Sequence, residues 1–109
     1  MNEPIVTCRL YIAGQSANSR YAVQNLTAFC EKYLPNRHEI EIIDVFLEPE
    51  RALGDRIFLT PALVVVSPSH GQSIVGDLSD NAVLLQALSV EIAAVGAEIA
   101  SVGAAGTGG

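Results

Sequence analysis

The sequence predicts an α/β fold in which a mixed sheet of four strands carries helices on both of its faces. Strand-like apolar runs alternate with segments whose apolar residues recur at helical spacing, in the order β-α-β-α-β-β-α. The opening strand-helix-strand unit favours a right-handed parallel crossover, whereas the two later strands are close enough to pair as a hairpin. Half of the 109 residues are hydrophobic, which suffices for the core of one domain.

The first strand is predicted over residues 5–13, where β-branched and aromatic residues are frequent and Gly14 ends the run. A polar turn follows the strand. Ser16, Asn18 and Ser19 are candidate N-caps there, because a short polar side chain can accept a hydrogen bond from the first turn of a helix.

The first helix is predicted over residues 20–34, and Pro35-Asn36 ends it. Its apolar residues recur every three or four positions, which is typical of a helix with one buried face. The expected buried positions are Ala22, Val23, Leu26, Phe29, Cys30 and Tyr33.

The second strand is predicted over residues 39–46 from its alternation of apolar and acidic residues. Its outward acids indicate a solvated face or an edge of the sheet. We expect Ile40, Ile42 and Val45 to face inward, and Glu39 and Glu41 to face outward.

The second half of the chain is predicted to hold a short helix, a hairpin and a final helix. Glu48-Pro49-Glu50 places proline and acids where a helix begins. The final helix is capped by Ser79 or Asp80, and its buried side is expected to carry Val83, Leu84, Leu85, Leu88 and Ile92. The elements are expected at residues 49–56 (helix), 62–66 and 73–75 (strands), and 79–92 (helix).

The chain is predicted to form one folded domain over residues 1–95, followed by a tail over residues 96–109. The tail consists almost entirely of Ala, Gly, Ser, Val and Thr, so it offers few groups able to pack. We expect the tail to be disordered.

Composition argues against several classes of protein. The net charge is −6 and the six basic residues are scattered, whereas nucleic-acid binding relies on clustered Lys and Arg. No apolar stretch is long enough for a transmembrane helix, and no signal peptide is recognisable. Two cysteines are too few for a disulfide framework or a zinc site. We therefore expect a cytoplasmic protein that binds neither nucleic acid nor membranes.

The sequence gives no support for redox catalysis. A thioredoxin-type enzyme needs a low-pKa thiolate at a helix N-terminus, usually in a Cys-x-x-Cys motif, and residues 14–19 contain no cysteine. Cys8 lies within a strand and Cys30 within a helix, so both are interpreted as core residues. His38 and His70 are interpreted as exposed loop residues. We predict no enzymatic activity and no cofactor.

Several segments of the chain form a recognisable set. They are residues 9–14, Asn18-Ser19, residues 43–45, residues 60–63 and residues 74–79. The most specific of them is the Gly-Asp-Leu-Ser segment that follows Thr-Pro. Together, over about residues 5–92, they resemble the KaiB family of circadian clock proteins, whose fold is thioredoxin-like.

The resemblance implies a protein-binding function. KaiB-like proteins bind the ATPase ring of KaiC and change its phosphorylation or ATPase timing. They are metamorphic, with a tetrameric ground state and a thioredoxin-like binding state whose energies are close. Slow isomerisation at Pro61 and Pro68 is expected to contribute to switching. The implied fold-switch residues are Pro61, Pro68, Gly76, Asp77, Ala87 and Ser89, and the candidate partner-binding residues are Arg20, Glu39, Glu41 and Arg56.

The sequence departs from clock-type relatives at three places. Those relatives often carry Gly and Asp at positions that we align with Ala87 and Ser89. Since Gly inside a helix costs about 1 kcal/mol relative to Ala, Ala87 is expected to favour the thioredoxin-like state, with monomers or dimers preferred over tetramers. Glu39 and Glu41 would repel an acidic partner, and residues 67–72 replace a basic, proline-rich hairpin. These departures fit either surface drift or a changed partner.

Two other functions remain open at this point. One is a stress or signalling adaptor on the same fold without a clock role. The other is a thioredoxin-fold redox enzyme or transferase, which would require a reactive thiol or a glutathione site.

Overall fold

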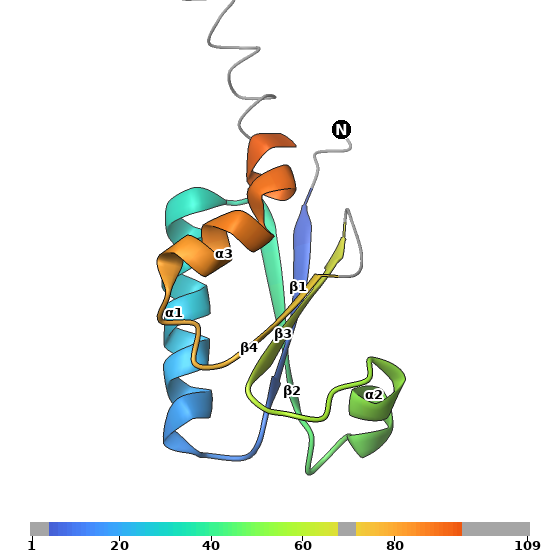
Figure 1. The fold of residues 1–109 in the computed structure, drawn as a ribbon. Coiled ribbons are helices and arrows are strands. Elements are labelled where there is room, and N and C mark those ends of the chain that lie inside the picture. The colour runs from blue at the N-terminus through green and yellow to red at the C-terminus, as the bar shows by residue number, and fades with distance from the viewer. Residues whose placement is uncertain (1–4, 68–71, 95–109) are drawn as a thin grey trace, which may run out of the picture.

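The computed structural model describes residues 5–67 and 72–94 of the chain, and it contains a sheet with helices on both faces (Figure 1). The predicted order β-α-β-α-β-β-α is confirmed. The elements are β1 (Val6–Ile12), α1 (Ala17–Tyr33), β2 (His38–Asp44), α2 (Pro49–Gly54), β3 (Ala62–Ser67), β4 (Gln72–Val75) and α3 (Asn81–Ala87).

The four strands lie in the order β2-β1-β3-β4, so β2 and β4 form the edges of the sheet. β1 pairs with β2 in parallel, as a crossover through α1 requires, and with β3 antiparallel. β3 and β4 pair as an antiparallel hairpin. The prediction that the acidic strand lies at an edge is confirmed.

Polar side chains set the start of α1. Ser16 is the N-cap, and its Oγ accepts a hydrogen bond from the backbone N–H of Ser19. The buried Ser19 hydroxyl accepts a hydrogen bond from the Ala13 N–H at 3.1 Å, which ties the helix to the end of β1. Ser16 is therefore the cap among the three predicted candidates.

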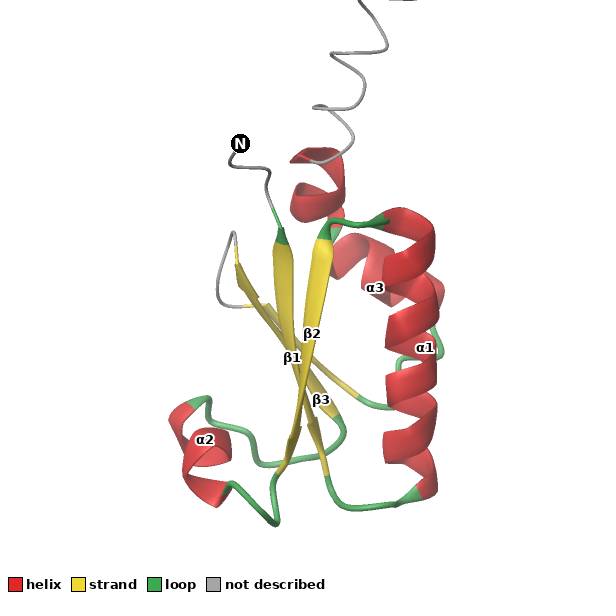
Figure 2. Ribbon diagram, turned by 180° about the vertical axis from the view of Figure 1, so that it is seen from behind, coloured by secondary structure: helices red, strands yellow, loops and turns green. Residues whose placement is uncertain are grey.

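α1 and α3 cover one face of the sheet, and α2 lies on the other, as Figure 2 shows from behind. The α1 face holds the larger core, in which Cys8 and Leu10 of β1 pack with Leu26 of α1 and Leu84 of α3. The α2 face holds a smaller cluster. That cluster consists of Tyr11, Ile43, Ala52, Ala62 and Val64, with Val45, Ile57 and Val66 packed against it.

Two predictions about the second strand need correction. Ile42, expected to face inward, is 46% exposed, whereas its neighbour Ile43 is fully buried against the α2 face. The cause is that both faces of the strand carry apolar side chains, so simple alternation does not identify the buried one. His38 is the first residue of this strand rather than a loop residue, and its Nδ1 lies 2.7 Å from the Leu34 carbonyl oxygen.

The final helix was expected to be continuous over residues 79–92, and this was wrong. Asp80 caps α3, which ends at Ala87. Leu88 has non-helical backbone angles, and residues 89–94 then form a second helical segment. The second helical segment takes a different direction in Figure 1. Leu84, Leu88 and Glu91 are all buried across this break, whereas Val83 and Leu85, expected to be buried, are exposed.

Candidate protein-binding surface

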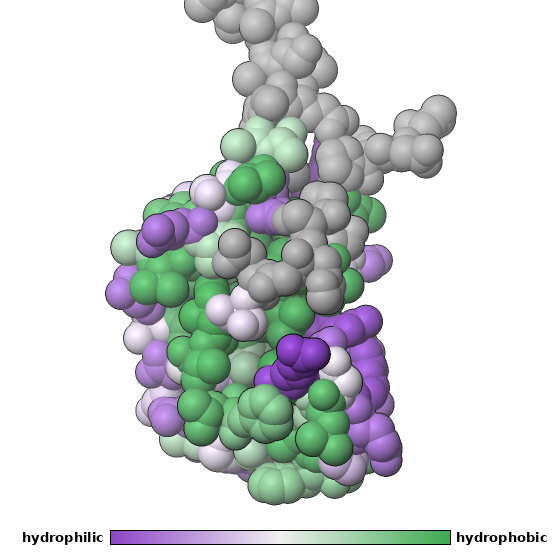
Figure 3. All heavy atoms as spheres, turned by 45° about the vertical axis from the view of Figure 1, so that its right-hand side comes forward, coloured by the Kyte–Doolittle hydropathy of each residue, from purple (hydrophilic) through white to green (hydrophobic). Residues whose placement is uncertain are grey.

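An exposed apolar surface surrounds α2. Five large side chains from the loop before α2, from α2 itself and from the loop after it are at least 66% exposed. We call this set the α2 surface; it consists of Phe46, Leu47, Leu53, Phe58 and Leu59. Figure 3 shows apolar side chains gathered over the lower end of the molecule, where α2 lies in Figure 1. Patches of this kind mark interaction sites in soluble proteins.

The local sequence explains why these side chains point outward. The carboxylate of Asp44 at the end of β2 accepts hydrogen bonds from the N–H groups of Phe46 and Gly14, at 2.9 and 3.3 Å, and this turns the chain sharply. Pro49 then starts a helix of six residues, in which Ala52 alone is buried. So short an amphipathic segment buries one small side chain and leaves its larger ones in solvent.

A charged network attaches α2 to the sheet. The Arg51 guanidinium donates two hydrogen bonds to the Glu41 carboxylate, at 2.6 and 2.8 Å. Arg9 lies between Glu41 and Asp55, and it donates to the Asp55 carboxylate at 3.1 Å. The Tyr11 hydroxyl contacts both the Asp55 carboxylate and the Arg51 carbonyl oxygen. Because these residues come from β1, β2 and α2, the network fixes α2 where its own apolar contacts are few.

The network shifts the acidities of its members. The hydrogen bonds from Arg51 hold the pKa of Glu41 below its usual value, and the same contact raises the pKa of Arg51. Burial and the hydrogen bond with Asp55 raise the pKa of Tyr11 to about 12. At neutral pH, Glu41 is therefore ionised and Tyr11 keeps its proton.

The structure places three of the four predicted partner-binding residues on the α2 side of the sheet. Glu39 and Glu41 lie on the α2 face of the edge strand, and Arg56 follows α2 with a positive φ of 58° and an exposed side chain. Arg20 lies on the other face, in the first turn of α1, where it lines a hollow with Val23. The structure therefore separates Arg20 from the other three.

Glu41 is exposed, as predicted, but it has basic partners within the chain. Its carboxylate is paired with Arg51 and lies 3.7 Å from Arg9, so its charge is balanced within the chain. The repulsion of an acidic partner that the sequence predicted for this position is thereby reduced. The sequence could not reveal this, since the three residues are brought together only by the crossover and by α2.

The predicted fold-switch residues lie in two places. The Thr60–Pro61 peptide is cis, and Gly76, with φ of 129°, precedes Asp77 at the end of β4. Ala87 is the last residue of α3 and Ser89 follows the break, so the argument that Ala87 stabilises a helix interior does not apply. Pro68 lies outside the described residues, as do His70 and the predicted tail over residues 96–109.

The two thiols are in the core, as predicted. Cys8 and Cys30 are fully buried and form no disulfide. The hydrogen bond between the two thiols and burial raise the pKa of Cys8, and the same hydrogen bond lowers the pKa of Cys30. Both thiols are fully buried, whereas disulfide exchange needs an accessible thiolate.

Sequence reasoning missed the α2 surface. The signal was present: Phe46-Leu47 and Phe58-Leu59 are apolar pairs on either side of a short helix that begins with proline.

In the described part of the chain, no group of three or more His, Cys, Asp or Glu side chains is arranged to hold a metal ion. Over the same residues, no helix combines the length and hydrophobicity needed to cross a membrane.

Comparison with known proteins identifies the family. The KaiB domain matches residues 9–90. The chain belongs to the KaiB domain family. Circadian clock protein KaiB3 of Synechocystis is 36% identical over 85 residues, which cover 78% of this chain and 83% of that protein. The circadian clock oscillator protein KaiB of Gloeothece citriformis is 35% identical over 82 residues, covering 75% and 77% of the two chains.

Solved structures confirm the thioredoxin-like fold. The N-terminal domain of SasA from Synechococcus elongatus superposes with a TM-score of 0.67 at 24% identity, covering 82% of this chain and 88% of that one. Chloroplastic thioredoxin z superposes with a TM-score of 0.66 at 17% identity, covering 82% and 80%. The chain thus combines a thioredoxin-like fold with membership of the KaiB family, whose members are in general non-enzymatic clock proteins.

Proposed function

We propose that this chain is a KaiB-like protein-binding module that associates with a KaiC-like clock ATPase and changes the timing of its ATPase or phosphorylation cycle. The observation that carries the proposal is the α2 surface, which exposes large apolar side chains on a protein of the KaiB family. Phenylalanine and other aromatic side chains are enriched in protein interfaces, and a few anchor residues supply most of the binding energy there. In this proposal the chain acts by binding its partner through the α2 surface.

The charged residues around α2 suit this function. Arg56, which follows α2, is exposed and gives the α2 surface a polar rim, whereas Glu39 is exposed at the start of β2 on the same side of the sheet. Rim charges act mainly on association rate and specificity, whereas the apolar centre supplies affinity. Arg20, on the other face, would contact the same partner only if that partner reached around the end of β1.

Control of binding through the fold is part of the proposal. The α2 surface is displayed in the thioredoxin-like packing, and a protein that also adopts a second packing would bind only while the first is populated. Pro61, Pro68, Gly76, Asp77, Ala87 and Ser89 remain the residues proposed to influence that equilibrium. We propose that residues 1–95 form one folded domain and that a monomer or dimer in the thioredoxin-like packing is the partner-binding species. We also propose a cytoplasmic location.

The proposal is tested by binding to a purified KaiC-like ATPase ring with ATP and with ADP, followed by native mass spectrometry and ATPase assays. Phe58 is 79% exposed, so Phe58→Ser is expected to fold normally. The variant is expected to weaken binding about tenfold or more, because exposed aromatic anchors are frequent hot spots. Arg56→Glu is expected to weaken it less.

Tyr21→Ser is the matched control, since Tyr21 is an aromatic residue 53% exposed on α1. It is expected to leave binding unchanged, and circular dichroism should show the same fold for all three variants. The proposal would be wrong if no complex formed with either nucleotide, or if Phe58→Ser and Tyr21→Ser bound equally well. In that case the stress or signalling adaptor becomes the better interpretation.

A further inference from the structure

The second edge of the sheet, β4, offers unpaired backbone groups. Among the described residues, β4 pairs only with β3. The Gly76 N–H donates to the Pro61 carbonyl oxygen at 2.9 Å. In an antiparallel ladder hydrogen-bonded positions alternate, so Ile74 bonds to β3 while the N–H and C=O groups of Ser73 and Val75 point away from it. The backbone groups of Ser73 and Val75 could therefore form hydrogen bonds with an extended chain that lay beside β4.

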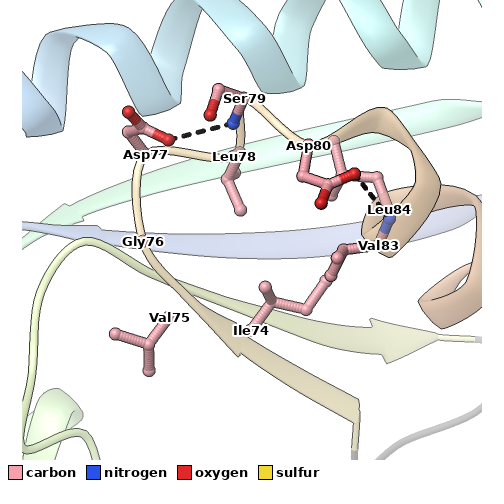
Figure 4. Close-up of a pocket in the computed structure, with 9 residues that line it drawn as sticks. All are labelled: Ile74, Val75, Gly76, Asp77, Leu78, Ser79, Asp80, Val83 and Leu84. Carbon is pink, nitrogen blue, oxygen red and sulfur yellow. Dashed lines mark hydrogen bonds between the residues drawn. The ribbon is translucent and has the colours of Figure 1, made fainter.

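A groove runs between β4 and α3. Ser73 and Ile74 form one wall, and Val83 and Ala87 of α3 form the other. The groove continues into a hollow of ≈ 120 Å³ beside Val75, drawn in Figure 4. This volume is close to the ~150 Å³ of an engineered cavity that holds benzene, so one aliphatic side chain fits.

One end of the groove is acidic. Asp77 and Asp80 line the hollow across from Ile74 and Val75 (Figure 4). Hydrogen bonds from Ser79 hold the pKa of Asp77 below its usual value. The segment 72–94, which builds both walls, contains three acidic residues and neither Lys nor Arg. Among the described residues no basic side chain forms an ion pair with Asp77 or Asp80, although Lys32 of α1 lines a neighbouring hollow with Ser79 and Asn81. The end of the groove where β4 stops is therefore acidic.

We propose that the outer edge of β4 and the groove beside α3 bind an extended segment of another protein that carries alternating apolar residues and a Lys or Arg. The segment adds a fifth strand by pairing with Ser73 and Val75. Alternate side chains enter the groove against Ile74 and Val83. The segment runs antiparallel to β4, so a basic residue that precedes the paired stretch in its sequence lies past Gly76, beside Asp77 and Asp80.

The charge distribution favours a foreign segment over a second copy of this chain. Pairing of two β4 edges would bring two acidic segments together without any basic residue from residues 72–94. This groove lies on the α1 and α3 face, whereas the α2 surface lies on the other. Binding in the groove is thus independent of the function proposed above, and its test needs no ATPase.

The probe is the fluorescein-labelled peptide Gly-Lys-Val-Thr-Ile-Thr-Val-Gly, with a matched peptide in which Glu replaces Lys. Binding to the full chain is measured by fluorescence anisotropy. The binding site is located by changes in amide chemical shifts of ¹⁵N-labelled protein. We expect saturable binding of the Lys peptide, the largest shifts at Ser73 and Val75, and slower hydrogen exchange at these two amides. The Glu peptide is expected to bind at least twofold more weakly.

Asp80→Asn tests the charge while keeping a residue that caps helices well. It is expected to weaken binding of the Lys peptide about two- to fivefold, the range for an exposed ion pair. Glu31→Gln makes the same charge change on α1 and is expected to have no effect. Val75→Pro removes the outward N–H from an edge position that tolerates proline, and it is expected to abolish binding.

Three results would overturn the proposal: no saturation at millimolar peptide, shifts centred on α1 or β2 instead of β4, or equal binding of the two peptides. Concentration-dependent broadening at Ser73 and Val75 without peptide would also overturn it, because a second copy would then occupy the edge. The shift map of the unmodified chain does not depend on whether Val75→Pro folds.

Discussion

The two faces of the sheet are held to their helices by different forces. Among the described residues, thirteen form a continuous buried apolar core on the α1 face, beneath α1 and α3. On the α2 face five of the described residues are buried together, and the contact is completed by the hydrogen bonds and ion pairs of Arg9, Tyr11, Glu41, Arg51 and Asp55. The larger apolar core therefore supplies most of the folding free energy.

Because of this difference, the two faces of the sheet contribute differently to stability and to the exposed surface. A large core gives rigidity, and its side chains are unavailable to a partner. A short helix held largely by exposed ion pairs is less firmly fixed, since such pairs contribute little in water. It also leaves its large apolar side chains in solvent. The α1 face thus holds most of the apolar core, and the α2 face exposes the large apolar side chains through which we propose that the ATPase partner binds.

The largest expected effect lies in the core of the α1 face. Leu26→Ala removes a fully buried side chain between α1 and the sheet and is expected to lower the free energy of unfolding by about 2–5 kcal/mol. Leu53→Ala, at a position 66% exposed on α2, is expected to change it by less than about 0.5 kcal/mol. Urea denaturation measures both, and equal losses would contradict the comparison.

An intermediate effect is expected where α2 is attached by hydrogen bonds. Tyr11→Phe removes the hydroxyl that contacts Asp55 and the Arg51 carbonyl oxygen, and it is expected to cost about 1–2 kcal/mol. Hydrogen exchange should accelerate in α2 more than in α1. Tyr21→Phe, on the exposed side of α1, serves as the control with little expected change.

The smallest effect concerns the ion pair between Glu41 and Arg51. Because folding lowers the pKa of Glu41, its ionised form stabilises the fold above its unfolded pKa of about 4.3, and this contribution is lost as pH falls through the folded pKa. Glu41→Gln is therefore expected to cost about 0.5 kcal/mol near pH 6, the range for an exposed pair, and less near pH 3, where protonation weakens the pair.

Urea denaturation of the Glu41→Gln variant at the two pH values measures this difference. Glu39→Gln, on the same strand and without an ion pair to the described residues, is expected to show no such pH dependence. A cost of Glu41→Gln that stayed constant with pH would mean that the carboxylate acts through packing rather than through its charge.

The sequence predicted the element order and most of the core on the α1 face. Two local patterns carried these predictions: the helical spacing of Ala22, Leu26 and Phe29, and the apolar run of β3. Each pattern depends only on which side of its own element is buried. The absence of cysteine from residues 14–19 was equally local. These features could be predicted without knowing which helices and strands pack against one another.

Only the tertiary structure decided what lies around α2 and along β4. Glu41 is paired because the crossover and α2 bring Arg9 and Arg51 to it, and α3 ends at Ala87 although nothing in its sequence breaks a helix. The open edge of β4 follows from strand order, which periodicity does not encode. The physical reason is common to all three: a residue's own pattern fixes its local conformation, whereas its partners come from distant segments that only packing brings together.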